Sequence, residues 1–156
     1  LPEPLLSNNG TKIFDLKYPN KKMSKSEENP AGVISMFDDI DSITTKIMRA
    51  TTDSDNCVKF DPVNKPGISN LLNIASALSD ISVSELEKKF EGKGYGDFKK
   101  YVADVTVEHI KSIQEKYNEL INSDELEKIL NKGIEKSRKL AKEKYELMKE
   151  KLGITR

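Results

Sequence analysis

In the stretch "DFKKYVADVTVEHIKSIQEKYNELIN", residues 97–122, apolar side chains recur every three or four residues. This spacing places them on one face of an amphipathic α-helix, so it predicts a helix from about Asp97 to Asn122. The expected members of that face are Phe98, Val102, Val105, His109, Ile113, Tyr117 and Leu120. Such a face needs partner helices, which favours a mainly α-helical fold.

The chain after this stretch continues the helical pattern. Ser123 in "SDELEKIL" is expected to start a last helix that runs to Gly153, with a kink allowed at Gly133. Opposite charges such as Glu135 and Lys139 are typical of a solvated outer face. Apolar residues form a second stripe along this helix: Leu126, Ile129, Leu130, Ile134, Leu140, Met148 and Leu152. The two long helices therefore predict a helical bundle.

Shorter helices are expected upstream. Acidic residues followed by helically spaced isoleucines predict a helix over residues 41–50. Ser69 is expected to cap the helix in "NLLNIASALS", and Ser82 with Glu85 forms a capping box for "VSELEKKFE". Gly92 would end that helix.

Composition excludes several classes of protein. The chain has 36% hydrophobic and 33% charged residues, with 26 basic and 26 acidic side chains, so no global positive field indicates nucleic-acid binding. A single cysteine, Cys57, cannot form an internal disulfide, and no apolar run approaches the roughly 20 residues of a membrane span. We therefore expect a cytoplasmic protein with no membrane contact.

A lysine-rich loop stands near the N-terminus. A short strand is expected over residues 10–16, followed by "NKKMSKSEENPAGVI", residues 20–34. Asn29 and Pro30 suit the N-cap and first turn of a helix. A cationic loop that leads into a helix N-terminus favours phosphate binding, although a merely solvated charged loop is the alternative.

The five residues Lys22 to Ser26 are KMSKS, the second signature of the class I aminoacyl-tRNA synthetases. The flanking blocks "KMSKSEENPAGVISMFDD", "ATTDSD", "FDPVNKPGISNLLNIASALS" and "FEGKGYGDFKKYVADVTVE" resemble the bacterial tryptophanyl-tRNA synthetase family in order and spacing. The resemblance runs through essentially the whole chain. The related tyrosyl family does not share "KPGISNLL" and "GKGYGDFK" in this form.

The resemblance implies a fold and its division. Residues 1–40 would be the C-terminal remnant of a Rossmann-like α/β catalytic domain with the KMSKS loop. Residues 41–156 would be an α-helical anticodon-binding region with a C-terminal helix. In the family the HIGH-type segment and the tryptophan pocket lie upstream, so we expect the chain to begin within a longer, homodimeric enzyme and to be inactive alone.

The resemblance also implies a reaction and its residues. Family members activate tryptophan with ATP, as its Mg²⁺ complex, and transfer it to tRNA(Trp). The catalytic residues carried over are Lys22 and Lys25, and the ATP-binding residues are Ile13, Lys22, Met23, Ser24, Lys25 and Ser26. No metal site of the protein itself is expected, because His109 has no second histidine or spare cysteine to share a metal.

A weaker signal concerns RNA. Lys93, Tyr95, Lys99 and Lys100 place cations beside aromatic rings that could stack a splayed tRNA base, although Tyr95 and Phe98 would serve equally well as core residues. The glycines of residues 92–96 favour a helix-to-helix junction over a phosphate cradle, because no strand precedes them. A second basic cluster either approaches the tRNA backbone or forms a solvated face: Lys136, Arg138, Lys139, Lys142 and Lys144. The competing hypothesis is a free-standing helical RNA-binding or assembly module without catalysis.

Overall fold

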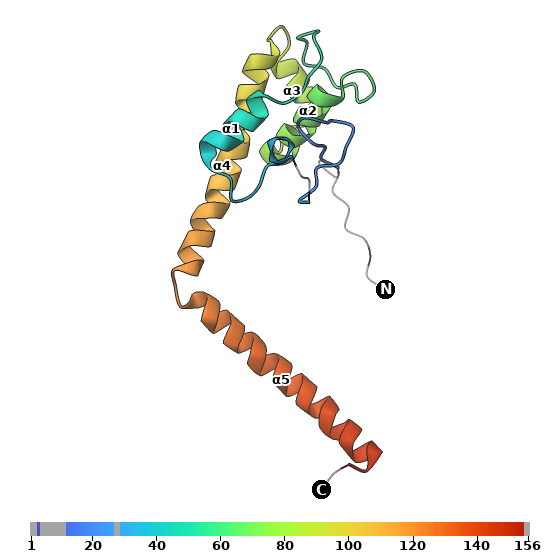
Figure 1. Ribbon diagram of the computed structural model, residues 1–156, viewed down its shortest axis with the longest axis vertical. Coiled ribbons are helices and arrows are strands. Elements are labelled where there is room, and N and C mark those ends of the chain that lie inside the picture. The colour runs from blue at the N-terminus through green and yellow to red at the C-terminus, as the bar shows by residue number, and fades with distance from the viewer. Residues whose placement is uncertain (1–2, 4–11, 27–28, 155–156) are drawn as a thin grey trace. The chain divides into compact units, whose positions relative to one another are not determined.

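The computed structural model describes residue 3 and residues 12–26 and 29–154, and over these ranges the protein is mainly helical (Figure 1). The elements are the 3₁₀ turn η1 (Pro30–Gly32) and the helices α1 (Ile40–Met48), α2 (Pro66–Ser79), α3 (Val83–Lys89), α4 (Tyr95–Ile121) and α5 (Glu125–Leu152). Extended pairing within the described ranges is one antiparallel bridge between Phe14 and Lys22. The mainly α prediction is thus confirmed, while Gly10 and Thr11 of the expected strand lie outside the described residues.

The chain divides into two compact units, residues 1–114 and 115–156. In the first unit α1 lies alongside α4, with α2 and α3 beside them (Figure 1). Their buried side chains form one hydrophobic core, which includes Ile43, Ile47, Ile68, Leu71, Leu86, Phe98 and Val102. Phe98 is fully buried and meets the ring of Phe90 edge-on, with centroids 5.0 Å apart. The predicted helix therefore packs against this core over its N-terminal part, as far as Ile110.

The buried face of α4 differs from the predicted one after its second turn. Phe98 and Val102 are buried as expected, but the face continues through Thr106 and Ile110, whereas His109 is exposed. Thr106 tolerates burial because its hydroxyl donates to the carbonyl of Val102 at 2.7 Å. The prediction drew the packed face through Val105 and His109 and passed over Thr106 and Ile110, so its register was wrong by one residue there.

The helix starts are set by local chemistry. The capping box is confirmed: the Ser82 hydroxyl accepts from the Glu85 N–H, and the Glu85 carboxylate accepts from the Ser82 N–H at 3.1 Å. The prediction for Ser69 was wrong, because α2 begins at Pro66, whose fixed φ suits a first helical position. Ser69 lies inside α2, where its hydroxyl accepts from the Asp61 N–H at 2.9 Å.

The second unit contains α5, a single helix that continues through Gly133 and ends where Gly153 adopts a left-handed φ of 67°. The predicted apolar stripe of this helix is exposed, with Leu140 at 60% and Leu152 at 66%, and no residue of α5 is buried. Its many charged side chains allow such a helix to persist in water. Within the described ranges, no helix is long and apolar enough to cross a membrane.

Candidate functional site

The lysine-rich loop is held at its entry by backbone hydrogen bonds. The Met23 N–H donates to the Ile13 carbonyl at 3.0 Å, and the Asp15 N–H donates to the Lys21 carbonyl at 2.9 Å. These two bonds flank the single bridge between the segments. The start of the KMSKS segment is therefore paired with the short extended piece before it.

The loop is also held where it ends. The Leu16 N–H donates to the Gly32 carbonyl at 2.9 Å, which ties the turn η1 to the same extended piece. Asn29 caps η1 by accepting from the Ala31 N–H at 3.0 Å, as predicted. The expected helix there is only this 3-residue turn, because the backbone leaves helical geometry at Val33. A helix dipole therefore contributes nothing to this loop, and its positive charge must come from side chains.

A buried carboxylate lies beneath η1. Asp15 is only 1% exposed, and its Oδ1 accepts from the N–H groups of Lys17 at 2.7 Å and Tyr18 at 2.8 Å. A Cβ atom added to Gly32 would collide with this carboxylate. Glycine is therefore the residue that lets η1 lie directly on Asp15.

Between these two anchors the loop presents its polar groups to solvent. The exposed members are Lys22, Ser24, Lys25 and Ser26, whereas Ile13 and Met23 are partly buried against the core. The hydroxyls of Ser24 and Ser26 lie 3.1 Å apart. Two ammonium groups and two hydroxyls on an exposed loop with fixed ends form an arrangement suited to a polyanionic ligand.

The predicted RNA-stacking residue Tyr95 is part of the core. The residue is 7% exposed, its hydroxyl donates to Asp53 Oδ1 at 2.6 Å, and its N–H donates to Asn56 Oδ1 at 2.7 Å. A ring enclosed in this way cannot stack on a splayed base, and the same holds for the fully buried Phe98. The core interpretation of both aromatic residues is therefore the correct one.

Lys99 is likewise committed to the fold. It is half-buried, and its ammonium donates to the Ala50 carbonyl at 2.8 Å, while Lys17 donates to the Arg49 carbonyl at 2.7 Å. Burial lowers the pKa of Lys99, and the positive charge of Lys17 lowers it further. The two lysines satisfy carbonyl groups at the C-terminal end of α1, where a helix favours cations.

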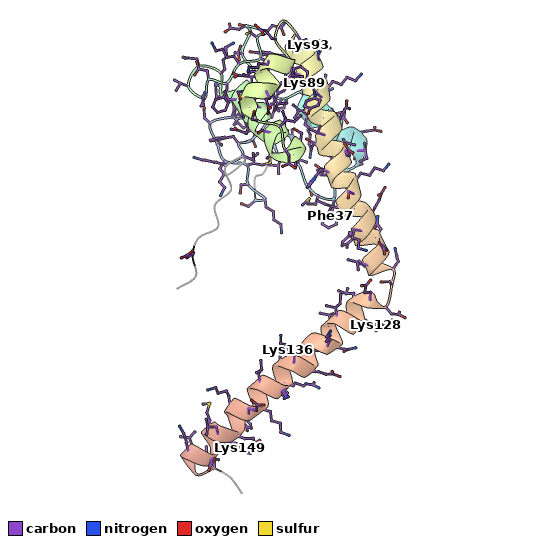
Figure 2. All side chains as sticks on the ribbon, turned by 180° about the vertical axis from the view of Figure 1, so that it is seen from behind. Phe37, Lys89, Lys93, Lys128, Lys136 and Lys149 are labelled. Carbon is purple, nitrogen blue, oxygen red and sulfur yellow. The ribbon has the colours of Figure 1, made fainter. Side chains whose placement is uncertain are left out.

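Lys93 and Lys100 remain at the surface. The Lys93 ammonium lies 5.2 Å from the ring centroid of Phe90, and the neighbouring Lys89 lies 4.0 Å from that of Tyr101 (Figure 2). A hollow of about 450 Å³ opens beside Lys93, between residues 56–59 and 87–94. Lys89, Lys93 and Lys100 offer positive charge to a ligand. Lys93 and Lys89, however, cover the rings of Phe90 and Tyr101.

The second basic cluster, which begins at Lys136, lies on α5 (Figure 2). The side chains of Lys136, Arg138, Lys139, Lys142 and Lys144 are all exposed. Among the described residues no three His, Cys, Asp or Glu side chains gather as a group that could hold a metal ion.

The Tyr95 hydroxyl belongs to a polar cluster with Asp53, Asp55 and Lys65. Although burial favours the neutral acid, hydrogen bonds from the Tyr95 hydroxyl and the Asp55 N–H hold the pKa of Asp53 below its usual 3.8. Lys65 lies 2.9 Å from Asp55 and 3.6 Å from Asp53, and its hydrogen bond to Asp55 raises its pKa. Burial, followed by the Asp53 carboxylate, raises the pKa of Tyr95 to about 12. The neutral phenol is therefore the donor at neutral pH.

Tyr95→Phe is expected to lower the free energy of unfolding by about 1–3 kcal/mol at neutral pH, because it removes a donor from a carboxylate with little access to water. The pKa of Asp53 is lower in the folded state than its usual value of 3.8. The ionised carboxylate therefore stabilises the fold fully above pH 3.8, and this stabilisation is lost as the pH falls through the folded-state pKa. The difference between the two proteins should therefore shrink in acid.

Urea denaturation at neutral pH and below pH 3.8 would check both parts of this expectation. Tyr101→Phe is the matched control, because the Tyr101 hydroxyl makes no hydrogen bond within the part of the chain that the structure describes. Equal losses in the two variants would contradict the role given to the bond between Tyr95 and Asp53.

Sequence reasoning missed Asn70. This residue of α2 is 2% exposed, and its side-chain amide bonds both backbone groups of Phe14 at 2.8 Å. The available signal was an amide among apolar neighbours in "ISNLLNIA", since a polar side chain in a buried helix must have partners.

Comparison with known proteins identifies the family. The sequence profile described as "tRNA synthetases class I (W and Y)" matches residues 2–111. Tryptophan–tRNA ligase of Bacillus anthracis is 50% identical over all 156 residues, and that of Bacillus subtilis is 44% identical over the same length. Each alignment covers 47% of the relative, so the chain spans about half the length of these proteins.

Solved structures of tryptophanyl-tRNA synthetases also match the fold of this chain. Tryptophanyl-tRNA synthetase from Campylobacter jejuni matches 91% of this chain and 43% of its own, with a TM-score of 0.71 and 32% identity. The enzyme from Mycoplasma pneumoniae matches 72% of this chain and 36% of its own, with a TM-score of 0.67 and 36% identity. The exposed KMSKS loop, the helical core and the profile match together show that the chain belongs to the class I tRNA synthetases of the tryptophan and tyrosine group.

Proposed function

We propose that the protein carrying this chain is a tryptophan–tRNA ligase, which forms tryptophanyl-adenylate from tryptophan and ATP and transfers tryptophan to tRNA(Trp). The observation that carries the proposal is the exposed KMSKS segment, fixed at both ends, in a chain that is 50% identical throughout to a tryptophan–tRNA ligase. A free-standing RNA-binding module would have no use for such a loop, so the catalytic reading is the better supported one.

In the first step a carboxylate oxygen of tryptophan attacks the α-phosphorus of ATP, and the bond to the departing pyrophosphate breaks. Negative charge grows on the pyrophosphate, and the ammonium groups of Lys22 and Lys25 would stabilise it most strongly in the transition state. Ser24 and Ser26 would donate hydrogen bonds, while Ile13 and the Met23 backbone would lie against the nucleotide. Mg²⁺ would enter with ATP, held mainly by phosphate oxygens and water.

The second step is attack by the terminal ribose hydroxyl of tRNA(Trp) on the adenylate. We assign residues 1–40 to the catalytic domain and residues 41–156 to tRNA contact, a functional division that differs from the packing units. Lys93 and Lys100 are the exposed candidates for phosphate contact, since Tyr95 and Lys99 are engaged in the core. Contact through a few lysines would weaken steeply with added salt.

The remaining parts of the proposal concern assembly and compartment. The tryptophan pocket would lie in the part of the protein beyond this half-length match, and the working enzyme would be a homodimer. Aminoacyl-tRNA synthesis serves translation, so the cytoplasm is the compartment in which we expect it.

Amino-acid-dependent exchange of pyrophosphate into ATP tests the proposal on the full protein that contains this chain. Tryptophan is expected to support exchange, and tyrosine to support it at least roughly 100-fold less well, as a shaped pocket discriminates between side chains that differ in polar groups. Exchange with tyrosine instead would overturn the substrate assignment. Exchange with neither amino acid would favour the non-catalytic RNA-binding module.

A further inference from the structure

The side-chain amide of Asn70 forms two hydrogen bonds with the backbone of Phe14. The Phe14 N–H donates to Asn70 Oδ1 at 2.8 Å, and Asn70 Nδ2 donates to the Phe14 carbonyl, also at 2.8 Å. The orientation of the amide is fixed by this pairing, because an N–H can only donate and a carbonyl can only accept. Asn70 therefore does for Phe14 what a neighbouring strand would do, although it lies 56 residues away on α2.

The segment that Asn70 holds is the common support of the KMSKS loop. Residues on either side of Phe14 bond the loop entry, through the Ile13 carbonyl with Met23 and the Asp15 N–H with Lys21. The next residue, Leu16, bonds the loop exit at the Gly32 carbonyl. A displacement of Phe14 would therefore shift both ends of the loop that carries the two proposed catalytic lysines.

We infer that Asn70 is a positioning residue for adenylate formation, which fixes the KMSKS loop by pairing with the backbone of Phe14. The inference rests on the proposed function and extends it to a residue that touches neither ATP nor tryptophan. It also gives α2, in the helical region proposed to contact tRNA, a direct mechanical link to the ATP loop.

The substitution Asn70→Asp turns this geometry into a pH-dependent test. A protonated aspartic acid has the shape of asparagine and can accept from the Phe14 N–H while donating to the Phe14 carbonyl. The ionised form cannot donate, and it sets a negative carboxylate against a carbonyl oxygen. Because the site is 2% exposed, burial and the carbonyl should raise the pKa of the introduced acid.

Few charges near the site would interfere. The small hollow beside Asn70 is lined by phenylalanine, proline, asparagine and serine side chains, none of which titrates. Two lysines lie next to Phe14: Lys12 is over its ring at 5.0 Å, and Lys22 is its partner in the antiparallel bridge. The Asp15 carboxylate is turned toward the N–H groups of Lys17 and Tyr18. The ratio of variant to wild-type rate should thus report the introduced acid.

Tryptophan-dependent ATP–pyrophosphate exchange on the full protein, measured across pH, is the experiment. We expect Asn70→Asp to approach the wild-type kcat at about pH 6, where the acid is protonated, and to fall roughly 10-fold below it at about pH 8.5, with KM for tryptophan nearly unchanged. Asn70→Ala should lower kcat by a similar factor at every pH, because it loses both bonds without adding a charge. It also keeps the test available if the aspartate variant fails to fold.

Two matched controls separate positioning from general loss of stability. Ile74→Ala removes buried apolar volume from the same helix, and Asn118→Asp makes the same chemical change at an exposed position. Neither should give a pH-dependent ratio. A folded Asn70→Ala protein with wild-type kcat, or an Asn70→Asp ratio that is flat with pH, would overturn the inference. Absence of exchange in the wild-type protein would instead overturn the proposed function, and the inference with it.

Discussion

Lys25→Ala in the full protein is expected to slow tryptophanyl-adenylate formation by about 100- to 1,000-fold while changing affinity for tRNA(Trp) little. The Lys25 ammonium stands exposed on a loop that is anchored at both ends, so it is free to meet the phosphates without prior rearrangement of the fold. Its interaction would strengthen as charge develops on the departing pyrophosphate, which makes the loss appear in kcat.

Single-turnover adenylate formation and tRNA binding, measured on the same preparation, would check this expectation. Lys25→Arg keeps the charge in a bulkier, planar group and should fall between the wild-type and alanine proteins. Lys132→Ala removes one exposed charge from α5 and serves as the control for net charge. Equal losses of adenylate formation and tRNA binding in Lys25→Ala would count against a specific role in ATP chemistry.

Structural features set by neighbouring residues could be predicted from the sequence. The capping box of Ser82 and Glu85 needs only residues three apart, and it appears in the structure as expected. The long helix α4 was predicted within two residues at its start because its apolar period is strong. These features depend on neighbours along the chain, so they could be predicted without knowing the fold.

Features that depend on distant partners could not be predicted. Tyr95 is buried because Asp53, 42 residues away, accepts its hydroxyl, and Asn70 is buried because Phe14 supplies both bonding groups. On α4 the buried residues are Tyr95, Phe98, Val102, Ala103, Thr106 and Ile110. Thr106 is polar, and its burial depends on the hydrogen bond that its hydroxyl donates to the Val102 carbonyl. A stripe drawn mainly from apolar side chains therefore passes over it.

The candidate site also combines features that neighbouring residues mark in the sequence with features that depend on distant partners. The KMSKS residues were located by their sequence, because five adjacent residues carry the signature, whereas their support was not. The loop is held by Ile13, Asp15 and Leu16 through backbone groups, which every residue type possesses and no sequence pattern marks. Asp15 and Gly32 are exceptions, because the residue type matters at both positions. The buried Asp15 carboxylate fills the space that a side chain at position 32 would need.

Gly32→Ala is expected to destabilise the protein by about 1–3 kcal/mol and to slow adenylate formation together with it. The new Cβ atom would occupy the position of the Asp15 carboxylate, which is 1% exposed and bonded to the N–H groups of Lys17 and Tyr18. Either the carboxylate leaves those donors or η1 moves away from Leu16. Both responses disturb the exit of the KMSKS loop, so stability and kcat should fall in parallel.

Gly96→Ala is the matched control, because a Cβ atom at that position in the first turn of α4 meets no atom within 4 Å. It should leave exchange unchanged and raise stability by up to about 1 kcal/mol, since alanine is the better helix former. Chemical denaturation and ATP–pyrophosphate exchange on both variants would separate the effect of the collision from that of replacing glycine. A Gly32→Ala protein with wild-type stability and exchange would contradict the packing of η1 on Asp15, and with it the anchoring of the loop exit on which the positioning argument depends.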